Sequence, residues 1–364
     1  MRTVMWEAEG PAVRMIDQRL LPGEVVLIDL RTVEEVSEAI RDMAVRGAPA
    51  IGATAAFGYA LAAAVSEATD SDVMWKDLDA AYAALAGSRP TASNLVWALE
   101  RLRSRAVAAA DQSPQALRQL LLQEALRLAD EDVEINKAMG RFGAELIQDS
   151  DTVIHHCNTG ALATVDYGTA LGVIRTAHEQ GKHVHVLVDE TRPRLQGARL
   201  TAWELDQYGV PHEIISDNAA GYFLSRGHPG TGRKQVAACF VGADRVAGNG
   251  DVANKIGTYM LALAARDNEV PFYVVVPTST VDLSLPSGAE ITIEERDPRE
   301  VLDLEHKGKA IAPADSKARN PAFDITPHRL VSAFVTEVGI LRPPYADTLA
   351  EAVQQAQETI EAAN

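Results

Sequence analysis

Cys157 is the first residue whose surroundings suggest chemistry. It follows the apolar run TVIHH (152–156), and Asn158-Thr159-Gly160 after it is typical of a helix start. A thiol near a helix N-terminus sees a positive partial charge and ionises more easily. Cys157 is therefore a candidate reactive or substrate-contacting thiol, although free cysteine also serves as a small apolar filler. Cys239, inside the apolar run VAACFVG (236–242), is typical of such a filler.

Asp244 is the candidate acid. It stands where an apolar run ends and the segment GADRVAGNGDVANKIGTY (242–259) begins. Partial desolvation favours the neutral form of a carboxyl group and moves its pKa towards the range useful for acid–base catalysis. The alternatives are a helix cap or an ion pair with the neighbouring Arg245.

The same segment predicts an anion site. Gly248-Asn249-Gly250 forms a tight turn, and we expect Asp251 to cap a helix whose first turn holds Asn254 and Lys255. Free backbone N–H groups, an amide and an ammonium at a helix N-terminus suit a phosphate group. Because the lysine falls after the predicted helix start, the segment is not a nucleotide-binding Walker loop.

A second set of anion-binding candidates lies in the first half of the chain. Arg46-Gly47-Ala48-Pro49-Ala50-Ile51-Gly52 ends one predicted helix and begins a helix of small residues. Glycine lets the backbone approach a ligand closely, and the guanidinium groups of Arg46 and Arg89 can grip phosphate oxygens in a forked geometry. Either arginine could equally be an ordinary surface or interdomain residue.

Other patterns exclude common cofactors. His155 and His156 are adjacent on a predicted strand and point to opposite faces, so they cannot ligate one metal together. The chain has neither paired-cysteine zinc spacing nor a Gly-x-Gly-x-x-Gly after a strand, so we expect no metal and no dinucleotide cofactor. GHPGTGRK (227–234) has glycines at Walker spacing, but Arg233 takes the place of the lysine, and we expect a mobile loop.

The elements that would position these residues change character near residue 148. Residues 11–30 alternate like short strands, and residues 32–147 have helical periodicity, with Ser113-Pro114 as a helix start. After Gln148, apolar runs alternate with helical stretches, which predicts a parallel, doubly wound sheet with ligands at the carboxyl ends of its strands. The runs are TVIHH (152–156), HVHVLVD (183–189), HEIIS (212–216), VAACFVG (236–242) and FYVVV (272–276), with helices near 160–180, 196–209, 217–226 and 251–267.

The predicted fold class is therefore α/β. We expect a mainly helical N-terminal domain with a small β-sheet over residues 1–147, followed by a Rossmann-like catalytic domain over residues 148–364. Polar residues end four of the predicted strands, namely Cys157, Asp189 to Arg194, Asp217 and Asp244. We expect them to meet along one edge of the sheet.

Composition narrows the class of protein. The 364 residues carry a net charge of −17, which disfavours nucleic acids and anionic membranes as partners. Two cysteines make no disulfide framework and suit a reducing compartment, and the N-terminus MRTVMWEAEG lacks the apolar core of a signal peptide. The apolar run Ala50–Val65 is shorter than the roughly 20 residues that span a bilayer, so we expect a helix packed inside the protein. A cytoplasmic location is the expectation.

Several long motifs occur in an order that is highly specific. In this order the chain resembles the methylthioribose-1-phosphate isomerase family, which is similar to the alpha, beta and delta regulatory subunits of eukaryotic initiation factor 2B. The segments that carry the resemblance are VRGAPAIG, SRPTASNL, HCNTGALAT, DETRPRLQGARLTAWEL, SDNAAGYF, GADRVAGNGDVANKIGTY, PFYVVVPTSTVD and NPAFDITP.

The resemblance implies a cofactor-free isomerase of a sugar phosphate, usually a homodimer. It implies that Asp244 donates a proton and Cys157 assists the transition state. The residues that it implies contact the substrate are Arg46, Gly47, Ala48, Arg89, Gln196, Asn254 and Lys255. Two alternatives remain. One is an isomerase of another pentose 1-phosphate, such as 5-deoxyribose 1-phosphate or ribose 1,5-bisphosphate. The other is a non-catalytic regulatory subunit.

Overall fold

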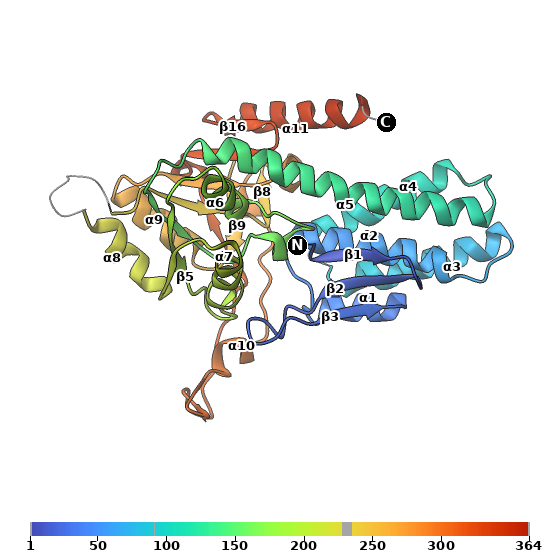
Figure 1. The fold of residues 1–364 in the computed structure, drawn as a ribbon, viewed down its shortest axis with the longest axis horizontal. Helices are drawn as coiled ribbons and strands as arrows, with labels where there is room; N and C mark the ends of the chain where they lie inside the picture. Colours follow the sequence, from blue (N-terminus) through green and yellow to red (C-terminus); the bar gives the residue numbers. More distant parts are fainter. Residues whose placement is uncertain (1, 91, 228–234, 363–364) are drawn as a thin grey trace. The chain divides into compact units, whose positions relative to one another are not determined.

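The structure of the chain is a computed structural model that describes residues 2–90, 92–227 and 235–362 (Figure 1). It contains two compact units. Unit 1 comprises Met1–Lys137 and Gly160–Gly168, and unit 2 comprises Ala138–Thr159 and Thr169–Asn364. The domain boundary that the sequence predicts between residues 147 and 148 falls inside unit 2. The division into an N-terminal and a catalytic domain stays a prediction. Most of the glycine-rich loop over 227–234 lies outside the described residues.

Unit 1 consists of a small antiparallel sheet and helices, as the sequence predicts. The sheet has the order β1-β2-β3, and β1 is the one strand of the three that the sequence patterns did not indicate. Ser113 precedes the longest helix and its Oγ accepts a hydrogen bond from Ala116 N, as expected of a cap. The elements are β1 (Val4–Glu7), β2 (Ala12–Ile16), β3 (Leu27–Leu30), α1 (Val33–Arg41), α2 (Ala48–Val65), α3 (Ser71–Ser88), α4 (Ser93–Ala108) and α5 (Pro114–Ala144), the last continuing into unit 2.

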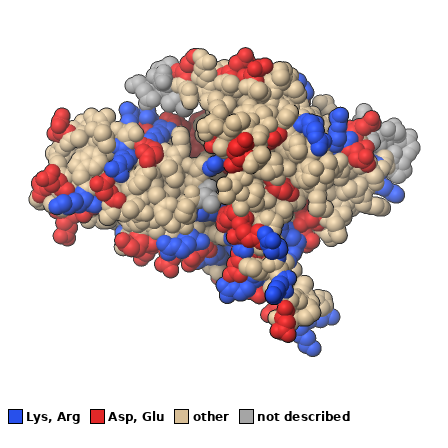
Figure 2. Space-filling view, turned by 180° about the vertical axis from the view of Figure 1, so that it is seen from behind, with Lys and Arg blue, Asp and Glu red and all other residues tan. Residues whose placement is uncertain are grey.

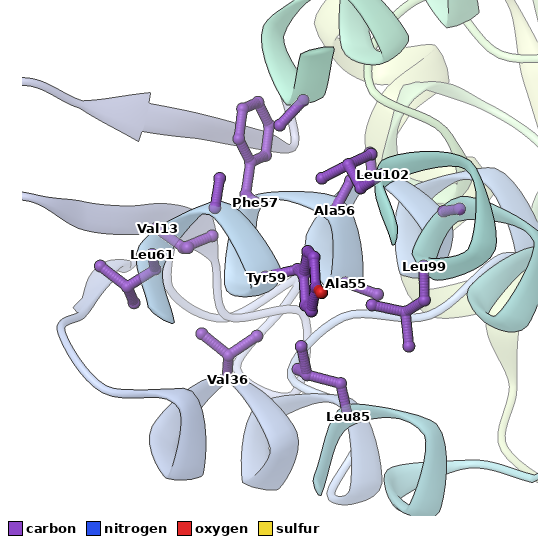
Figure 3. Close-up of a cluster of buried hydrophobic side chains, with 14 of the residues drawn as sticks. Val13, Val36, Ala55, Ala56, Phe57, Tyr59, Leu61, Leu85, Leu99 and Leu102 are labelled. Atoms are coloured by element: carbon purple, nitrogen blue, oxygen red, sulfur yellow. The ribbon is translucent and has the colours of Figure 1, made fainter. Parts of the chain in front are cut away.

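Helix α2 forms the centre of unit 1. By length and composition it could cross a membrane, but 78% of its 18-residue window is buried inside the protein. Alanine and glycine let neighbouring elements approach it, so that Phe57, Tyr59 and Leu61 pack against side chains from other elements, including Val36 and Leu85 (Figure 3). Burial in protein explains its apolar composition, as the sequence analysis predicts.

Unit 2 contains a seven-stranded sheet of order β16-β15-β10-β7-β4-β5-β6. Its strands are parallel except β16, which pairs antiparallel to β15. The five strands that the apolar runs predict are all present, whereas β15 and β16 were not predicted. The strands are β4 (Thr152–His155), β5 (His185–Asp189), β6 (His212–Ile215), β7 (Ala238–Val241), β10 (Phe272–Val275), β15 (Ala333–Thr336) and β16 (Gly339–Leu341).

Helical segments connect these strands close to where the sequence places them, but two begin later than expected. The α-helix after Cys157 begins only at Ala170, and the helix after Asp251 begins only at Thr258. The longer segments are α6 (Ala170–Glu179), η2 (Gly197–Thr201), α7 (Ala202–Tyr208), α8 (Ala220–Ser225), α9 (Thr258–Asp267), α10 (Arg299–Leu302) and α11 (Tyr345–Ala362), and the three-residue turns are η1 (Ala161–Ala163), η3 (Asp217–Ala219), η4 (Thr278–Thr280), η5 (Gly288–Glu290) and η6 (His328–Leu330).

A second sheet corrects the prediction of a helix from residue 251. Gly248-Asn249-Gly250 closes a hairpin in which Gly250 N donates to Ala247 O and Gly250 has φ +89°. Asn-Gly between apolar strands is a strong hairpin signal. The sheet has the order β11-β8-β9-β14, with β8 (Arg245–Ala247), β9 (Val252–Lys255), β11 (Val281–Asp282) and β14 (Phe323–Thr326), and a separate hairpin pairs β12 (Glu305–His306) with β13 (Lys309–Ala310).

Candidate active site

The seven-stranded sheet changes winding direction between β4 and β7. From β4 the chain proceeds outward through β5 and β6, then returns to place β7 on the other side of β4. In open α/β sheets the crevice for ligands lies at the carboxyl ends of the strands at such a switch point. Cys157 follows β4 and Asp244 follows β7, so topology brings the thiol and the carboxyl group to the same point of the same edge.

Hydrogen bonds hold the backbone of Cys157 on both sides. Its N–H donates to Thr191 Oγ1 at 2.9 Å, and its carbonyl accepts from Thr201 Oγ1 at 2.6 Å. The residue is 7% exposed and has φ +70°, a left-handed conformation that costs a non-glycine residue about 1–2 kcal/mol. Such strain persists only where the surroundings impose it, and it clusters at functional sites.

The expected helix N-terminus beside the thiol is absent. The segment after Cys157 forms only the three-residue η1, and α6 begins at Ala170. A different positive group takes that place. The ammonium of Lys255 interacts electrostatically with Cys157 and with Asp244.

Lys255 is buried, with 8% of its surface exposed. Burial lowers its pKa below 10.5, while charges on Cys157 and Asp244 oppose that shift. Its Nζ donates to Ala322 O at 2.7 Å and lies 4.9 Å from the centre of the Phe323 ring. Asp244 itself is half-buried, and its N–H donates to Ala253 O on the strand that carries Lys255.

The predicted helix-end phosphate site is wrong in its geometry. Asn254 and Lys255 lie on β9, not in the first turn of a helix. Two N–H groups at the start of α9 are already engaged, since those of Gly257 and Tyr259 donate to the Asp324 carboxylate at 2.8 and 3.1 Å. Asn254 Nδ2 donates to Thr258 Oγ1 at 3.0 Å. An anion near β9 would therefore meet the side chains of Asn254 and Lys255, and it could not use the N–H groups of Gly257 and Tyr259.

Gln196 shows a polar atom that has no partner inside the described part of the protein. The residue is 8% exposed, and its Oε1 is buried without a hydrogen-bond partner among the described residues. It precedes η2, a π-helical segment of a kind frequent at functional sites. Gly197 allows this segment to pack on β5, because a Cβ there would lie 1.7 Å from Asp189 O. A buried, unpaired acceptor suits a hydroxyl donor of a ligand.

Unit 1 holds the remaining predicted substrate-binding residues. Gly47 is the N-cap of α2 with φ +97°, and a Cβ there would lie 2.4 Å from Ala163 O. The motif RGAPAIG therefore packs on the Gly160–Gly168 segment, which continues the chain from Cys157. Arg46 and Ala48 flank Gly47, and Arg89 is the C-cap of α3; these three residues are half-buried. The sequence predicts that the motif beginning at Arg46 ends a helix. In the structure α1 already ends at Arg41, so Arg46 lies beyond it.

A buried polar cluster was missed as a unit by the sequence analysis. One ligand-type atom each from His156, Asp189 and Asp217 lie within 4.8 Å of one another. That distance alone would suit a cation, but hydrogen bonds already engage both His156 nitrogens and both Asp217 oxygens. Asp189 and Asp217 were visible as strand-end polar residues. From the sequence, His156 is a candidate only for a metal site shared with His155, because its pairing with Asp189 on β5 depends on strand order.

Comparison with known proteins now gives the family. Residues 44–343 match the model of the Initiation factor 2 subunit family. A methylthioribose-1-phosphate isomerase of Synechococcus sp. is 53% identical over 348 residues, which are 96% of this chain and 97% of that protein. The chain belongs to the methylthioribose-1-phosphate isomerase family.

Solved structures agree with this membership. The crystal structure of 5-methylthioribose 1-phosphate isomerase from Pyrococcus horikoshii OT3 has a TM-score of 0.89 and 45% identity, covering 97% of this chain and 96% of that one. A structure titled as translation initiation factor eIF-2B, subunit delta, from A. fulgidus has a TM-score of 0.85 and 42% identity, covering 97% and 99%. The family and the α/β fold class predicted from the motifs are thus confirmed. The roles of individual residues remain predictions.

Proposed function

We propose that this member of the methylthioribose-1-phosphate isomerase family converts 5-methylthioribose 1-phosphate to 5-methylthioribulose 1-phosphate, a step of methionine salvage, with Asp244 and Cys157 at the reacting carbons. The observation that supports these two roles is that charges on both residues act on the buried ammonium of Lys255. A thiol, a carboxyl group and an ammonium that interact electrostatically at a topological switch point suit a small anionic sugar.

The chemistry requires ring opening with the phosphate retained on C1. In its acid form Asp244 donates a proton to the ring oxygen as the bond from C1 to that oxygen breaks. A hydrogen then passes from C2 to C1, and the C2 hydroxyl returns a proton to the Asp244 carboxylate as the C2 carbonyl forms. Asp244 thus gives one proton and regains one, and no external oxidant or reductant enters.

The other predicted residues position the substrate. Lys255 and Asn254 supply a cation and an amide from β9, and the unpaired Oε1 of Gln196 accepts from a sugar hydroxyl. The family resemblance implies that Arg46, Gly47, Ala48 and Arg89 also contact the substrate, and their guanidinium and backbone N–H groups suit a phosphate. Fixing the reacting atoms in this way can supply roughly 7–11 kcal/mol of a barrier in the best cases.

The test is a turnover assay of the purified chain on 5-methylthioribose 1-phosphate carrying deuterium at C2. We expect turnover to the ketose without added metal or nucleotide cofactor. Retention of deuterium at C1 would identify a hydride shift, and its exchange with water an enediol route. 5-Deoxyribose 1-phosphate and ribose 1,5-bisphosphate serve as comparison substrates. Faster turnover of either, or no turnover of any, would contradict the proposal.

We further propose a cytoplasmic homodimer. Tyr222 on α8 and Met260 on α9 expose 58% and 63% of their surfaces, and these two helices contact each other. Large apolar side chains exposed on adjoining helices are typical of protein–protein interfaces. A second copy of this chain is the occupant that the family resemblance favours.

A further inference from the structure

A buried pair formed by His156, the residue before the proposed catalytic thiol, and Asp189 supports a further inference. His156 Nδ1 lies 2.8 Å from Asp189 Oδ2, and His156 Nε2 lies 3.0 Å from Ile256 O. A backbone carbonyl can only accept, so Nε2 carries a hydrogen. The contact between Nδ1 and Oδ2 then needs a second hydrogen, since otherwise two lone pairs would face each other. The two side chains together therefore hold one proton more than a neutral imidazole and a carboxylate would.

The charges around the pair favour this proton on the imidazole. Asp217 lies against the pair from the end of β6, and Asp324 on β14 interacts electrostatically with His156. Burial alone would lower the pKa of His156, but the Asp189 hydrogen bond and the charges of Asp189 and Asp217 outweigh it and raise that pKa. Burial also raises the pKa of Asp189. The pKa values of His156 and Asp189 are thus both shifted in the direction that keeps the shared proton bound.

The other charged groups around the pair complete this balance. Glu190 follows Asp189 in the chain and acts on it electrostatically, as does Asp217. Lys255 acts on Asp324 from β9. The neighbouring His155 stays neutral because burial lowers its pKa to about 4. Among the described residues named here, the groups that act on the pair are thus mostly carboxylates, which favours a positive imidazolium over a neutral ring.

The pair connects the two strand ends that carry the proposed site. His156 immediately precedes Cys157, and its Nε2 partner Ile256 immediately follows Lys255. On the other side, Thr191 Oγ1 accepts from Cys157 N and donates to Asp189 O at 2.9 Å. Gly257 packs directly on the ring, because a Cβ there would lie 2.9 Å from His156 Cε1. Displacing the ring would therefore shift the thiol and the ammonium relative to each other.

We propose that His156 is an imidazolium ion whose two hydrogen bonds, to Asp189 and to Ile256 O, position Cys157 against Lys255. His156 is a positioning residue, since it acts through its chain neighbours. The proposal rests on the proposed function only where activity is measured, because its protonation state has a readout of its own.

The first test is ¹⁵N NMR of the full chain with labelled histidine at neutral pH, with His156→Asn used to assign the signal. We expect both ring nitrogens of His156 to carry hydrogen and to show one-bond N–H couplings. A neutral ring with a bare Nδ1 would overturn the proposal whether or not the chain is an isomerase. A stoichiometric transition metal bound in wild type and lost in His156→Asn would overturn it as well.

The second test compares kcat in three variants. Asp189→Asn can donate from its amide to a neutral ring, so it should keep most of the wild-type kcat while its NMR spectrum shows a hydrogen on one ring nitrogen only. His156→Asn, which cannot bridge both partners, should lower kcat by about 10²-fold, as expected for misplaced reacting groups. His155→Asn is the matched control, because His155 is an adjacent buried histidine that bonds to Phe240 O instead. It should lower the melting temperature but leave kcat much closer to the wild-type value than His156→Asn does. Equal kcat losses in His155→Asn and His156→Asn would contradict a positioning role.

Discussion

Lys255 connects the residues whose chemistry was visible in the sequence. Cys157 and Asp244 could be selected because a polar residue directly after an apolar strand is exposed to ligand and partly desolvated. The sequence also indicates Lys255, but as part of a helix N-terminus, whereas the residue lies on β9. Its strand position could not be predicted, since a four-residue strand gives too little periodicity to separate from a helical turn.

Gln196 offers a test that links stability to function. Gln196→Met removes a buried oxygen that has no partner among the described residues and keeps a similar volume. We expect the free energy of unfolding to rise by about 1 kcal/mol, because an unpaired polar atom is removed. We expect kcat/KM for the sugar phosphate to fall by about tenfold through the loss of one hydrogen bond. Urea unfolding and steady-state kinetics measure the two changes. A drop in stability would mean that Oε1 has an internal partner.

His155 predicts how stability depends on pH. Burial lowers its pKa from 6.5 to about 4. As the pH falls, the unfolded chain therefore binds a proton at His155 at a higher pH than the folded protein does. The neutral ring makes its full contribution to the free energy of unfolding above pH 6.5. That contribution, about 3 kcal/mol, is lost as the pH falls towards 4. Urea unfolding between pH 6.5 and 4 should therefore show a steeper loss in wild type than in His155→Gln. His306→Gln, at an exposed hairpin position, should leave the slope unchanged, and an equal slope in all three proteins would refute the assignment.

At the scale of the elements, two glycines with left-handed backbone differ in how closely the fold packs against them. Gly47 and Gly181 both have positive φ, of +97° and +87°, but only Gly47 has backbone against the position of a Cβ. Gly181→Ala should cost about 1–2 kcal/mol from the left-handed backbone alone. Gly47→Ala should cost clearly more and should also raise KM, because the RGAPAIG motif must shift away from Ala163. Urea unfolding of both variants beside the wild type decides this, and equal losses would show that the contact at Ala163 yields easily.

The elements that could be predicted are those with strong patterns. The five strands that the sequence predicts, β4, β5, β6, β7 and β10, are short apolar runs, α2 is rich in small residues, and α5 has a Ser-Pro start. The second sheet could not be predicted in the same way, because its strands are short and pair between segments distant in sequence, as β9 does with β14. The Asn249-Gly250 hairpin was predictable in principle, but Asp251 also matches a helix cap, and its carboxylate in fact accepts from Gly288 N and His328 N.

At the scale of the whole molecule, the net negative charge disfavours nucleic acids and anionic membranes as binding partners. The net charge is −17, and on the face in Figure 2 basic and acidic side chains lie intermixed rather than gathered into a basic stripe. We expect no binding to a labelled DNA duplex or to anionic vesicles at physiological ionic strength, since phosphate-bearing surfaces need local positive charge. Fluorescence anisotropy and vesicle sedimentation check this expectation, and a salt-sensitive complex with either would contradict it.

Association of the chain is the second prediction at this scale. Sedimentation equilibrium should give twice the chain mass of 39.1 kDa. Met260→Glu would place a charge in the proposed interface and should shift the mass towards the monomer. Glu269→Gln, beyond the end of α9, serves as the control and should stay dimeric. A monomeric wild type, or a Met260→Glu variant that stays fully dimeric, would rule out this interface.

The central claim is that Asp244 and Cys157 act on one bound sugar. It is tested most directly by single-turnover ³¹P NMR of Asp244→Asn and Cys157→Ser with 5-methylthioribose 1-phosphate, with the Kd of each variant measured by calorimetry. We predict that both variants bind the sugar phosphate about as tightly as wild type, and that each slows conversion to the ketose by about 10²–10⁴-fold. A near-normal rate in either variant would show that its side chain does not take part in the reaction.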